Sequence, residues 1–385
     1  MKTLTTTAQL ADFCGRAAQH DYVTVDTEFL RERTYYSKLC LVQLAFPGDG
    51  QDDAVLVDPL SDELSLEPLY DLFRHESVVK VFHAARQDLE IFFVDARVLP
   101  KPFFDTQIAA MVCGYGEQVG YETLVRKVAR ESLDKSSRFT DWSRRPLSDK
   151  QKTYALADVT HLRVIYEKLR ARLDKSGRTP WVAEEVQVLL DPETYAAEPE
   201  NAWRRIKTRT NSRRFLGYVK ELAAFRESHA QTRNIPRNRV IKDDALLELA
   251  ATKPKSIADL SKSRLLLREA RKGDVADGLI AAVGRAAEIP EDALPKAPAS
   301  REKPQGMEAL SDLLRVLLKA KADGAGVAQK LIATAADLDD MLMSDGDHPA
   351  FRGWRGEVFG DDAAALIAGD IALSADGNKV KIVRV

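Results

Sequence analysis

The sequence has few cysteines and lacks long apolar segments. Its three cysteines, Cys14, Cys40 and Cys113, are far apart, and none belongs to a Cys-x-x-Cys pair. This spacing argues against a disulfide framework or a zinc site and favours buried free thiols in a reducing compartment. The chain has no run of about 18 apolar residues, which a membrane-spanning helix requires. Met1–Leu10 also lacks the basic and apolar regions of a signal peptide. We therefore predict a cytoplasmic protein that does not bind membranes.

The formal net charge is only −2, but the charges are unevenly distributed along the chain. Residues 1–200 carry 25 basic and 33 acidic side chains, whereas residues 201–289 carry 20 basic and 10 acidic ones. Residues 305–385 are acidic again, with 9 basic and 13 acidic side chains. A basic unit beside an acidic one is typical of a polyanion-binding module attached to a metal site. A solvated helical surface would give the same counts, so charge alone does not decide between the two.

A chain of 385 residues exceeds one typical domain, and the apolar patterns divide it into parts. β-branched runs predict strands at 21–29, 37–46, 54–58 and 78–82, and 3–4 spacing predicts helices at 67–74, 105–113, 121–130 and 149–173. Strands first and helices later indicate a mixed α/β sheet covered by helices. We predict this domain over residues 1–175, a helical linker over 176–202, all-α units over 203–290 and 305–385, and a linker over 291–304.

Four acidic residues and one tyrosine suggest a site in the first domain. Asp26 and Glu28 share one face of a strand, because strand side chains alternate. Asp88 follows a short strand near the start of a helix, and Tyr154 and Asp158 share one helix face at i, i+4. Taken singly, each is explained as well by a strand-end acid, a helix N-terminal acid or a core tyrosine. Taken together, the four carboxylates are the hard oxygen ligands that Mg²⁺ or Mn²⁺ prefers.

Two such cations about 4 Å apart would suit an in-line displacement at phosphorus. We predict that Asp26, Glu28, Asp88 and Asp158 hold these two cations and that Tyr154 orients the attacking water. On this interpretation all five residues are catalytic.

The order of these residues resembles the DEDD exonuclease superfamily, and the tyrosine places the resemblance in its DEDDy branch. Within that branch the sequence is most similar to the ribonuclease D family, through residues 25–29, 39–44, 82–89, 104–110 and 140–147. The resemblance implies a ribonuclease-H-like fold with a mixed five-stranded sheet. It also implies 3′→5′ hydrolysis of RNA that releases nucleoside 5′-monophosphates, with tRNA precursors and other structured RNAs as substrates.

The C-terminal units extend the resemblance. Residues 222–227 and 234–246 resemble the helical HRDC domain that ribonuclease D family members carry. Residues 353–360 and 366–373 resemble the ends of those chains, which suggests a second HRDC-like domain. Such helical domains packed around a nuclease in one chain lead us to expect a monomer.

Several residues are candidates for substrate contacts. Phe29, Gln43 and His83 would line the terminal nucleotide, and Arg144 and Arg145 would contact phosphate, although core packing or a solvated loop explains several of these positions equally well. In the basic unit we predict backbone phosphate contacts from Arg204, Arg205, Lys207, Arg209, Arg213, Arg214, Arg233, Arg237, Arg239 and Lys242.

Two alternatives remain open at this point. The chain could be a DNA-directed 3′→5′ exonuclease of the same superfamily, although no GxxxxGK[ST] nucleotide-binding motif of a helicase occurs in it. It could also be a non-catalytic RNA-binding module, but such a module would be expected to lack a metal ligand, and here every acid is present.

Overall fold

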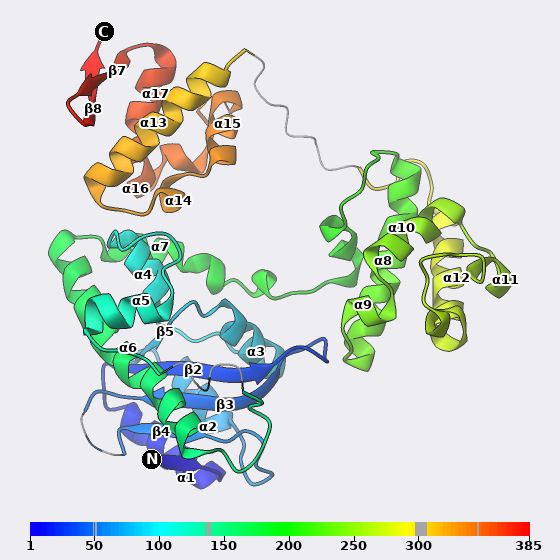
Figure 1. Ribbon diagram of the computed structural model, residues 1–385, viewed down its shortest axis with the longest axis horizontal. Helices are drawn as coiled ribbons and strands as arrows, with labels where there is room; N and C mark the ends of the chain where they lie inside the picture. The colour runs from blue at the N-terminus through cyan, green and yellow to red at the C-terminus, as the bar shows by residue number, and fades with distance from the viewer. Residues whose placement is uncertain (49, 51, 135–136, 138–139, 297–305, 345) are drawn as a thin grey trace.

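The computed structural model describes residues 1–48, 50, 52–134, 137, 140–296, 306–344 and 346–385. Three bodies follow one another along the chain: an α/β domain, a helical unit and a C-terminal unit (Figure 1). Each has its own cluster of buried apolar side chains. No helix among the described residues is long and apolar enough to cross a membrane. The predicted linker over 291–304 lies partly outside the described residues.

A mixed six-stranded sheet forms the centre of the first domain, in the order β1-β4-β3-β2-β5-β6. Its strands are β1 (Lys2–Leu4), β2 (Tyr22–Leu30), β3 (Lys38–Ala45), β4 (Ala54–Val57), β5 (Val79–Phe82) and β6 (Phe103–Asp105). β3 pairs antiparallel with both β2 and β4, whereas β5 runs parallel to β2 and β6, and β1 runs parallel to β4. The predicted mixed sheet is confirmed, but the expected count of five strands is wrong. The sixth strand is the short polar segment at the N-terminus, which lies at the edge beside β4.

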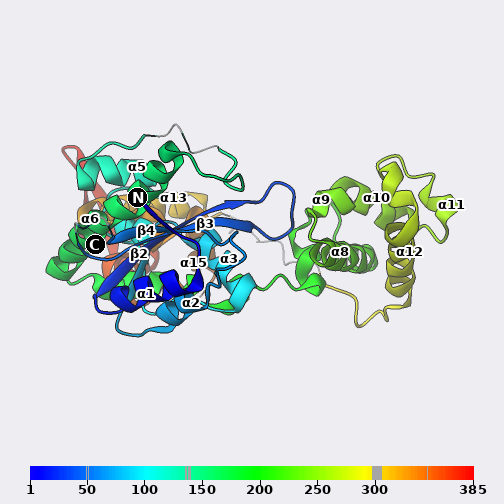
Figure 2. The same cartoon turned by 90° about the horizontal axis from the view of Figure 1, so that it is seen from below.

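Helices cover both faces of this sheet (Figure 2). They are α1 (Thr7–Ala17), α2 (Glu67–Arg74), α3 (Arg86–Ala96), α4 (Thr106–Val112), α5 (Tyr121–Leu124), the π-helical turn η1 (Val125–Ala129) and α6 (Asp149–Ser176). The long α6 begins with a capping box, in which the Ser148 side chain and Gln151 each bond the other's backbone N–H. It ends at Gly177, whose positive φ of 69° suits glycine. These local signals fix where α6 begins and ends.

The helical unit follows a linker of short helices: α7 (Thr179–Glu185), η2 (Gln187–Leu189), η3 (Pro192–Thr194) and η4 (Pro199–Arg205). The unit itself contains α8 (Arg213–Arg233), α9 (Arg237–Val240), α10 (Asp243–Thr252), α11 (Ile257–Leu260), η5 (Arg268–Arg271) and α12 (Gly273–Glu288). Its apolar cluster includes Trp203 and Tyr218, and it also includes Tyr35 from the loop between β2 and β3. The α/β domain therefore contributes a side chain to the core of the helical unit.

The C-terminal unit is mostly helical but ends in a β-hairpin. Its elements are α13 (Glu308–Ala325), α14 (Gln329–Ile332), α15 (Ala335–Met343), η6 (Pro349–Phe351), α16 (Gly353–Arg355), η7 (Gly356–Gly360), α17 (Asp361–Ala368), β7 (Ile371–Asp376) and β8 (Lys379–Arg384). The two strands pair antiparallel across Gly377, whose φ is +59°. The expectation of an all-α unit is therefore wrong for the last 15 residues, where alternating apolar residues flank an Asp-Gly turn.

The C-terminal unit packs on the α/β domain near α4 and α7. The rings of Trp181 and Trp354 stack at 4.5 Å between centroids. Arg355 forms ion pairs with Glu184 and Glu185. Gly114, with φ +75°, lies so close to Gly326 that a Cβ there would be 2.4 Å from the Gly326 carbonyl oxygen. Only glycine fits this approach between the two units.

Candidate active site

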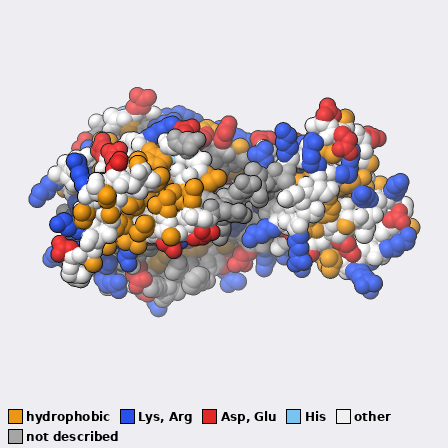
Figure 3. All heavy atoms as spheres, turned by 90° about the horizontal axis from the view of Figure 1, so that it is seen from above, with side chains coloured by type: hydrophobic (Ala, Val, Ile, Leu, Met, Phe, Trp, Pro, Cys, Tyr) orange, Lys and Arg blue, Asp and Glu red, His pale blue; other side chains and the backbone are white. Residues whose placement is uncertain are grey.

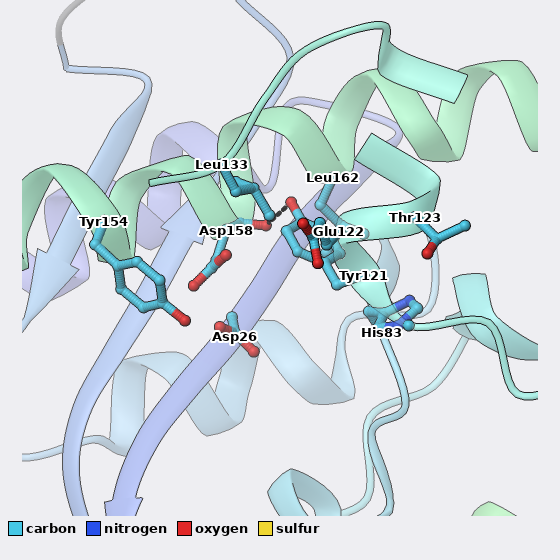
Figure 4. Close-up of a pocket in the computed structure, with 10 residues that line it drawn as sticks. Asp26, His83, Tyr121, Glu122, Thr123, Leu133, Tyr154, Asp158 and Leu162 are labelled. Atoms are coloured by element: carbon cyan, nitrogen blue, oxygen red, sulfur yellow. Dashed lines mark hydrogen bonds between the residues drawn. The ribbon is translucent and has the colours of Figure 1, made fainter. Parts of the chain in front are cut away.

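The strand β2 and the helix α6 bring Asp26, Tyr154 and Asp158 to one place. The Thr24 hydroxyl donates to the Val159 carbonyl at 2.9 Å and so holds α6 against one face of β2. Asp26 lies on that same face two residues along the strand. Figure 4 shows the Tyr154 hydroxyl and the carboxylates of Asp26 and Asp158 pointing toward one another. The predicted pairing of Tyr154 with Asp158 along one helix face is therefore present.

Asp88 reaches the site from the first turn of α3. Its carboxylate accepts a hydrogen bond from the Thr27 hydroxyl, and the side chain is buried. Asp105 holds the loop that precedes α3, because its carboxylate accepts from the backbone N–H groups of Ala84 and Ala85. Ala84 has a positive φ of 55°, so this loop is conformationally strained. No local sequence pattern predicts these supporting roles of Thr27 and Asp105.

The electrostatics of the cluster are unfavourable without a cation. Burial raises the pKa of Asp26 well above its usual value, and the charges of Asp158, Asp88 and Glu28 raise it further. Burial raises the pKa of Asp88 to about 7, while the Thr27 hydrogen bond opposes the shift. Among the described residues, the charges that act most strongly on Asp26 are all carboxylates. A set of buried acids with these mutual effects fits the hard cations predicted from the sequence.

A cavity of about 280 Å³ opens beside these residues. Its lining combines the acidic end of the site with a partly apolar end, and consists of Asp26, His83, Gly120, Tyr121, Glu122, Thr123, Leu133, Tyr154, Asp158 and Leu162. His83 lies at the end of β5, with Nδ1 3.0 Å from the Thr106 hydroxyl, and burial lowers its pKa. Asp88 and Glu28 do not line this cavity, although the charge of each acts on Asp26. The cavity gives access to Asp26 and Asp158 from the less acidic end.

Tyr121 is a site residue that the sequence analysis missed. Its hydroxyl donates to the backbone carbonyl of Asp158, and its ring lies 5.4 Å from that of His83. It therefore fixes α6 at the position of one acid while forming a wall of the cavity. A tyrosine at the start of a predicted short helix carries no local signal for this contact, which depends on tertiary packing.

The structure places the other predicted substrate residues outside this cavity. Gln43 is fully buried beneath α6, so it cannot contact a nucleotide in this conformation. Phe29 is partly buried at an irregularity in the β2–β3 pairing. Arg144 is highly exposed and pairs with Asp141. Among the residues predicted to contact substrate near the site, only His83 lines the cavity.

Arg145 has a structural environment instead of the predicted phosphate contact. Its guanidinium makes two hydrogen bonds to Asp58, at 2.6 and 2.7 Å, and one to the Cys40 carbonyl at 2.6 Å. Two further bonds go to the carbonyls of Trp142 and Arg144. All five donors are thereby used within the chain, because an arginine has no others. Arg145 joins the segment before α6 to β3 and β4.

The basic residues of the helical unit divide into two groups. The first group makes internal bonds: Arg213 and Arg214 bond backbone carbonyls after α12, Arg233 pairs with Asp274, and Arg205 and Arg237 pair with the buried Glu227. The second group is exposed and makes no side-chain hydrogen bond or ion pair with other described residues; it comprises Arg204, Lys207, Arg209, Arg239 and Lys242. Figure 3 shows Lys and Arg side chains spread over this unit with Asp and Glu among them.

A second group of possible metal ligands lies in the C-terminal unit. Asp337, Asp340 and His348 bring one ligand atom each to within 4.8 Å of the others. However, His348 Nδ1 accepts the Ala350 N–H at 3.1 Å, so Nε2 carries the proton of the neutral ring. Nε2 faces Asp337 at 3.8 Å. In this arrangement His348 caps the short helix η6, and its Nε2 faces the Asp337 carboxylate, so the predicted metal site remains at Asp26.

Comparison with known proteins assigns the chain to a family. Residues 1–174 match a family of 3′-5′ exonucleases, and residues 215–281 match the HRDC domain. The chain is 63% identical to ribonuclease D of Jannaschia sp. (strain CCS1), over 100% of this chain and 99% of that protein. It is 48% identical to ribonuclease D of Granulibacter bethesdensis, over 99% and 96%. The chain belongs to the ribonuclease D family.

A solved structure agrees with this assignment. The crystal structure of Escherichia coli RNase D, an exoribonuclease involved in structured RNA processing, superposes with a TM-score of 0.82 at 31% identity. The alignment covers 96% of this chain and 98% of that one. The predicted family and enzyme class, a hydrolase acting as a 3′→5′ exoribonuclease, are confirmed. The 3′-5′ exonuclease family that residues 1–174 match uses divalent metals.

Proposed function

We propose that this ribonuclease D family member removes nucleotides from RNA 3′ ends with two divalent cations, Mg²⁺ or Mn²⁺, held by Asp26, Glu28, Asp88 and Asp158. The observation that carries the proposal is that Asp26 of β2 and Asp158 of α6 meet at one cavity, with Asp88 of α3 and Glu28 of β2 close enough for their charges to act on Asp26. When bound, such a cation pair supplies activation of the attacking water and stabilisation of the leaving oxygen.

The chain's own residues would position the substrate and the water. Tyr154 presents its hydroxyl toward Asp26 and Asp158, where it hydrogen-bonds and orients the water in line with the scissile bond. His83, Tyr121 and Leu133 line the less acidic part of the cavity, where the base and ribose of the last nucleotide would lie. Attack at phosphorus with departure of the 3′ oxygen of the preceding nucleotide releases a nucleoside 5′-monophosphate.

We further infer that structured RNAs with 3′ extensions, such as tRNA precursors, are the substrates. The exposed residues Arg204, Lys207, Arg209, Arg239 and Lys242 would contact the phosphate backbone without reading sequence. Each lost contact with a single strand lowers the dependence of log K on log salt concentration by about 0.7. The variant Lys207→Gln/Arg209→Gln should therefore show a salt dependence that is shallower by about 1.4, whereas Arg213→Gln should leave the slope unchanged.

The decisive experiment incubates the purified chain with a 3′-extended tRNA precursor and identifies the products. We expect stepwise 3′ shortening and mononucleotide 5′-monophosphates in Mg²⁺ or Mn²⁺, and none in EDTA. A matched DNA oligomer tests the DNA-directed alternative, and faster loss of DNA than RNA would favour it. Shortening that persists in EDTA would contradict the two-cation mechanism.

A further inference from the structure

Gln43 is a buried polar side chain without a partner. It lies in the middle of β3 and is 0% exposed. Neither its Oε1 nor its Nε2 has a hydrogen-bond partner among the described residues. An amide buried in this way is destabilising, because neither of its polar atoms regains the hydrogen bonds that water provides in the unfolded chain. A glutamine at this position is therefore unfavourable for the fold as it stands.

The neighbours of Gln43 are apolar on every side but one. On its own strand, Leu41 and Ala45 share its face, and both belong to apolar clusters that include residues of α6. On β4 its register partner is Leu56, which is also apolar. On β2 its register partner is Asp26. The one acidic neighbour in register is therefore the central acid of the candidate active site.

The register of β2 and β3 places these two side chains within reach of a direct contact. Register partners of an antiparallel pair have Cβ atoms about 4.5–5.5 Å apart and point to the same face. A glutamine side chain carries its amide far enough to span such a gap. A carboxylate is the strongest acceptor available to an amide N–H in apolar surroundings. Residues that hold a metal-binding carboxylate in this way orient it and strengthen cation binding.

We propose that Gln43 is a positioning residue for Asp26, whose carboxylate accepts a hydrogen bond from the Gln43 amide in the cation-loaded enzyme. Gln43 thereby acts from inside the sheet and not on the nucleotide, which replaces the substrate contact predicted from the sequence. This inference rests on the proposed cation site at Asp26. It explains why an unpaired amide lies among the apolar side chains of β3 and β4 that α6 covers.

The test compares Gln43→Leu with wild type in two measurements on the full chain without RNA. Isothermal titration calorimetry should show that Gln43→Leu binds Mn²⁺ with an affinity 10- to 100-fold weaker than wild type. Urea unfolding in EDTA should show Gln43→Leu at least as stable as wild type, because the unpaired amide is gone. Gln43→Met, which keeps an unbranched side chain, provides a second apolar variant with the same expectation. Leu56→Met, at the register partner of Gln43 on β4, is the matched control, and its Mn²⁺ affinity should equal that of wild type.

Several outcomes would overturn the proposal. An Mn²⁺ affinity of Gln43→Leu within twofold of wild type would show that the amide does not support Asp26. Lower stability of both Gln43 variants in EDTA would show that the amide is already paired within the fold. If wild type itself binds no Mn²⁺, the cation site fails as well, and Asp26→Asn would then also leave the titration unchanged.

Discussion

At the scale of single residues, the site concentrates groups whose environment is unfavourable without a ligand. Asp26 is repelled by Asp158, Asp88 and Glu28, Ala84 has a strained backbone, and Gln43 has no hydrogen-bond partner in the described part of the chain. Such features persist only where the surrounding fold is stable enough to hold them. For the acids of the site, this means that removing a charge should raise the stability of the fold but abolish function.

Asp26→Asn should therefore separate stability from activity. The variant relieves repulsion among the buried carboxylates, so in EDTA it should be more stable than wild type by about 1 kcal/mol. It also loses a cation ligand, so RNA hydrolysis should fall by a factor on the order of 10³ or more, while RNA binding is retained. Urea unfolding and a product assay measure the two effects, with the exposed Asp62→Asn as control. Retained hydrolysis would contradict the assignment of Asp26.

Tyr154→Phe should slow the chemical step alone. The substitution keeps the ring that packs near Trp142, at 6.0 Å between centroids, and removes only the hydroxyl that faces Asp26. Loss of one orienting hydrogen bond in the transition state costs about 10²-fold in rate. Single-turnover kinetics at saturating enzyme would detect this loss, and RNA affinity should not change. A wild-type rate would remove Tyr154 from the mechanism.

The sequence predicted some of these residues and not others, for a physical reason. Strand alternation placed Asp26 correctly, and helix periodicity paired Tyr154 with Asp158, because both rules concern neighbours within one element. The burial of Gln43 and the five bonds of Arg145 depend on contacts between distant segments, which no local period encodes. Tyr121 was missed for the same reason.

At the scale of elements, the main strands and helices follow the sequence patterns and the short edge elements do not. The bounds of α2 were predicted residue for residue, and α6 extends only three residues beyond its predicted end. The edge strand β1 has three residues, too few for a recognisable alternation. The hairpin β7–β8 did carry a signal, since Asp376-Gly377 separates two alternating runs, but the surrounding helical patterns outweighed it.

Arg145→Gln should destabilise the segment that leads into α6. Asp58 is 8% exposed and would lose a bidentate partner, and the Cys40 carbonyl would lose a donor. Removing one member of a largely buried ion pair costs roughly 3–5 kcal/mol. Chemical unfolding measures the loss, and the exposed neighbour Arg144→Gln should change stability by no more than about 0.5 kcal/mol. Equal effects of the two substitutions would contradict the structural role of Arg145.

Lys80 in β5 should make stability rise at alkaline pH. Burial lowers the pKa of its ammonium from 10.5 to about 8, and Nζ bonds the carbonyls of His75 and Lys101 at 2.6 Å. Between pH 8 and pH 10.5 the unfolded chain binds the proton that the folded chain has released, so folding gains stability as pH rises. The difference in unfolding free energy between wild type and Lys80→Met should grow across this window. A constant difference would argue against a depressed pKa.

At the scale of the whole molecule, the α/β domain serves as the point of attachment for both other units. The C-terminal unit approaches it at Gly114 and stacks Trp354 on Trp181. Figure 3 also shows apolar side chains gathered on the outer face on the side of this unit. Leu313, Val316, Val380 and Val383 of the unit are exposed. The helical unit contacts the loop between β2 and β3, the strand pair that carries the site.

Tyr35 in that loop enters the core of the helical unit. Its hydroxyl donates to Glu227, which is 1% exposed, and accepts from Arg237 at 2.8 Å and Gln231 at 3.2 Å. The Asn234 side chain accepts from the backbone N–H groups of Tyr35 and Tyr36 at 3.1 and 3.0 Å. Because β2 carries Asp26 and leads directly into this loop, the contacts fix the basic surface of the helical unit relative to the site.

Tyr35→Ala should therefore reduce the advantage of long substrates without changing the chemistry. For a tRNA precursor that reaches the helical unit, KM should rise about tenfold, the cost of one buried polar contact of about 1.4 kcal/mol. For a dinucleotide that occupies only the cavity at Asp26, kcat and KM should stay at wild-type values. Tyr35→Phe, which retains the packing, should give a smaller rise, and Tyr36→Phe should give none. If Tyr35→Ala impairs hydrolysis of the dinucleotide as much as that of the tRNA precursor, Tyr35 supports the conformation of β2. The proposal that it positions the helical unit would then be wrong.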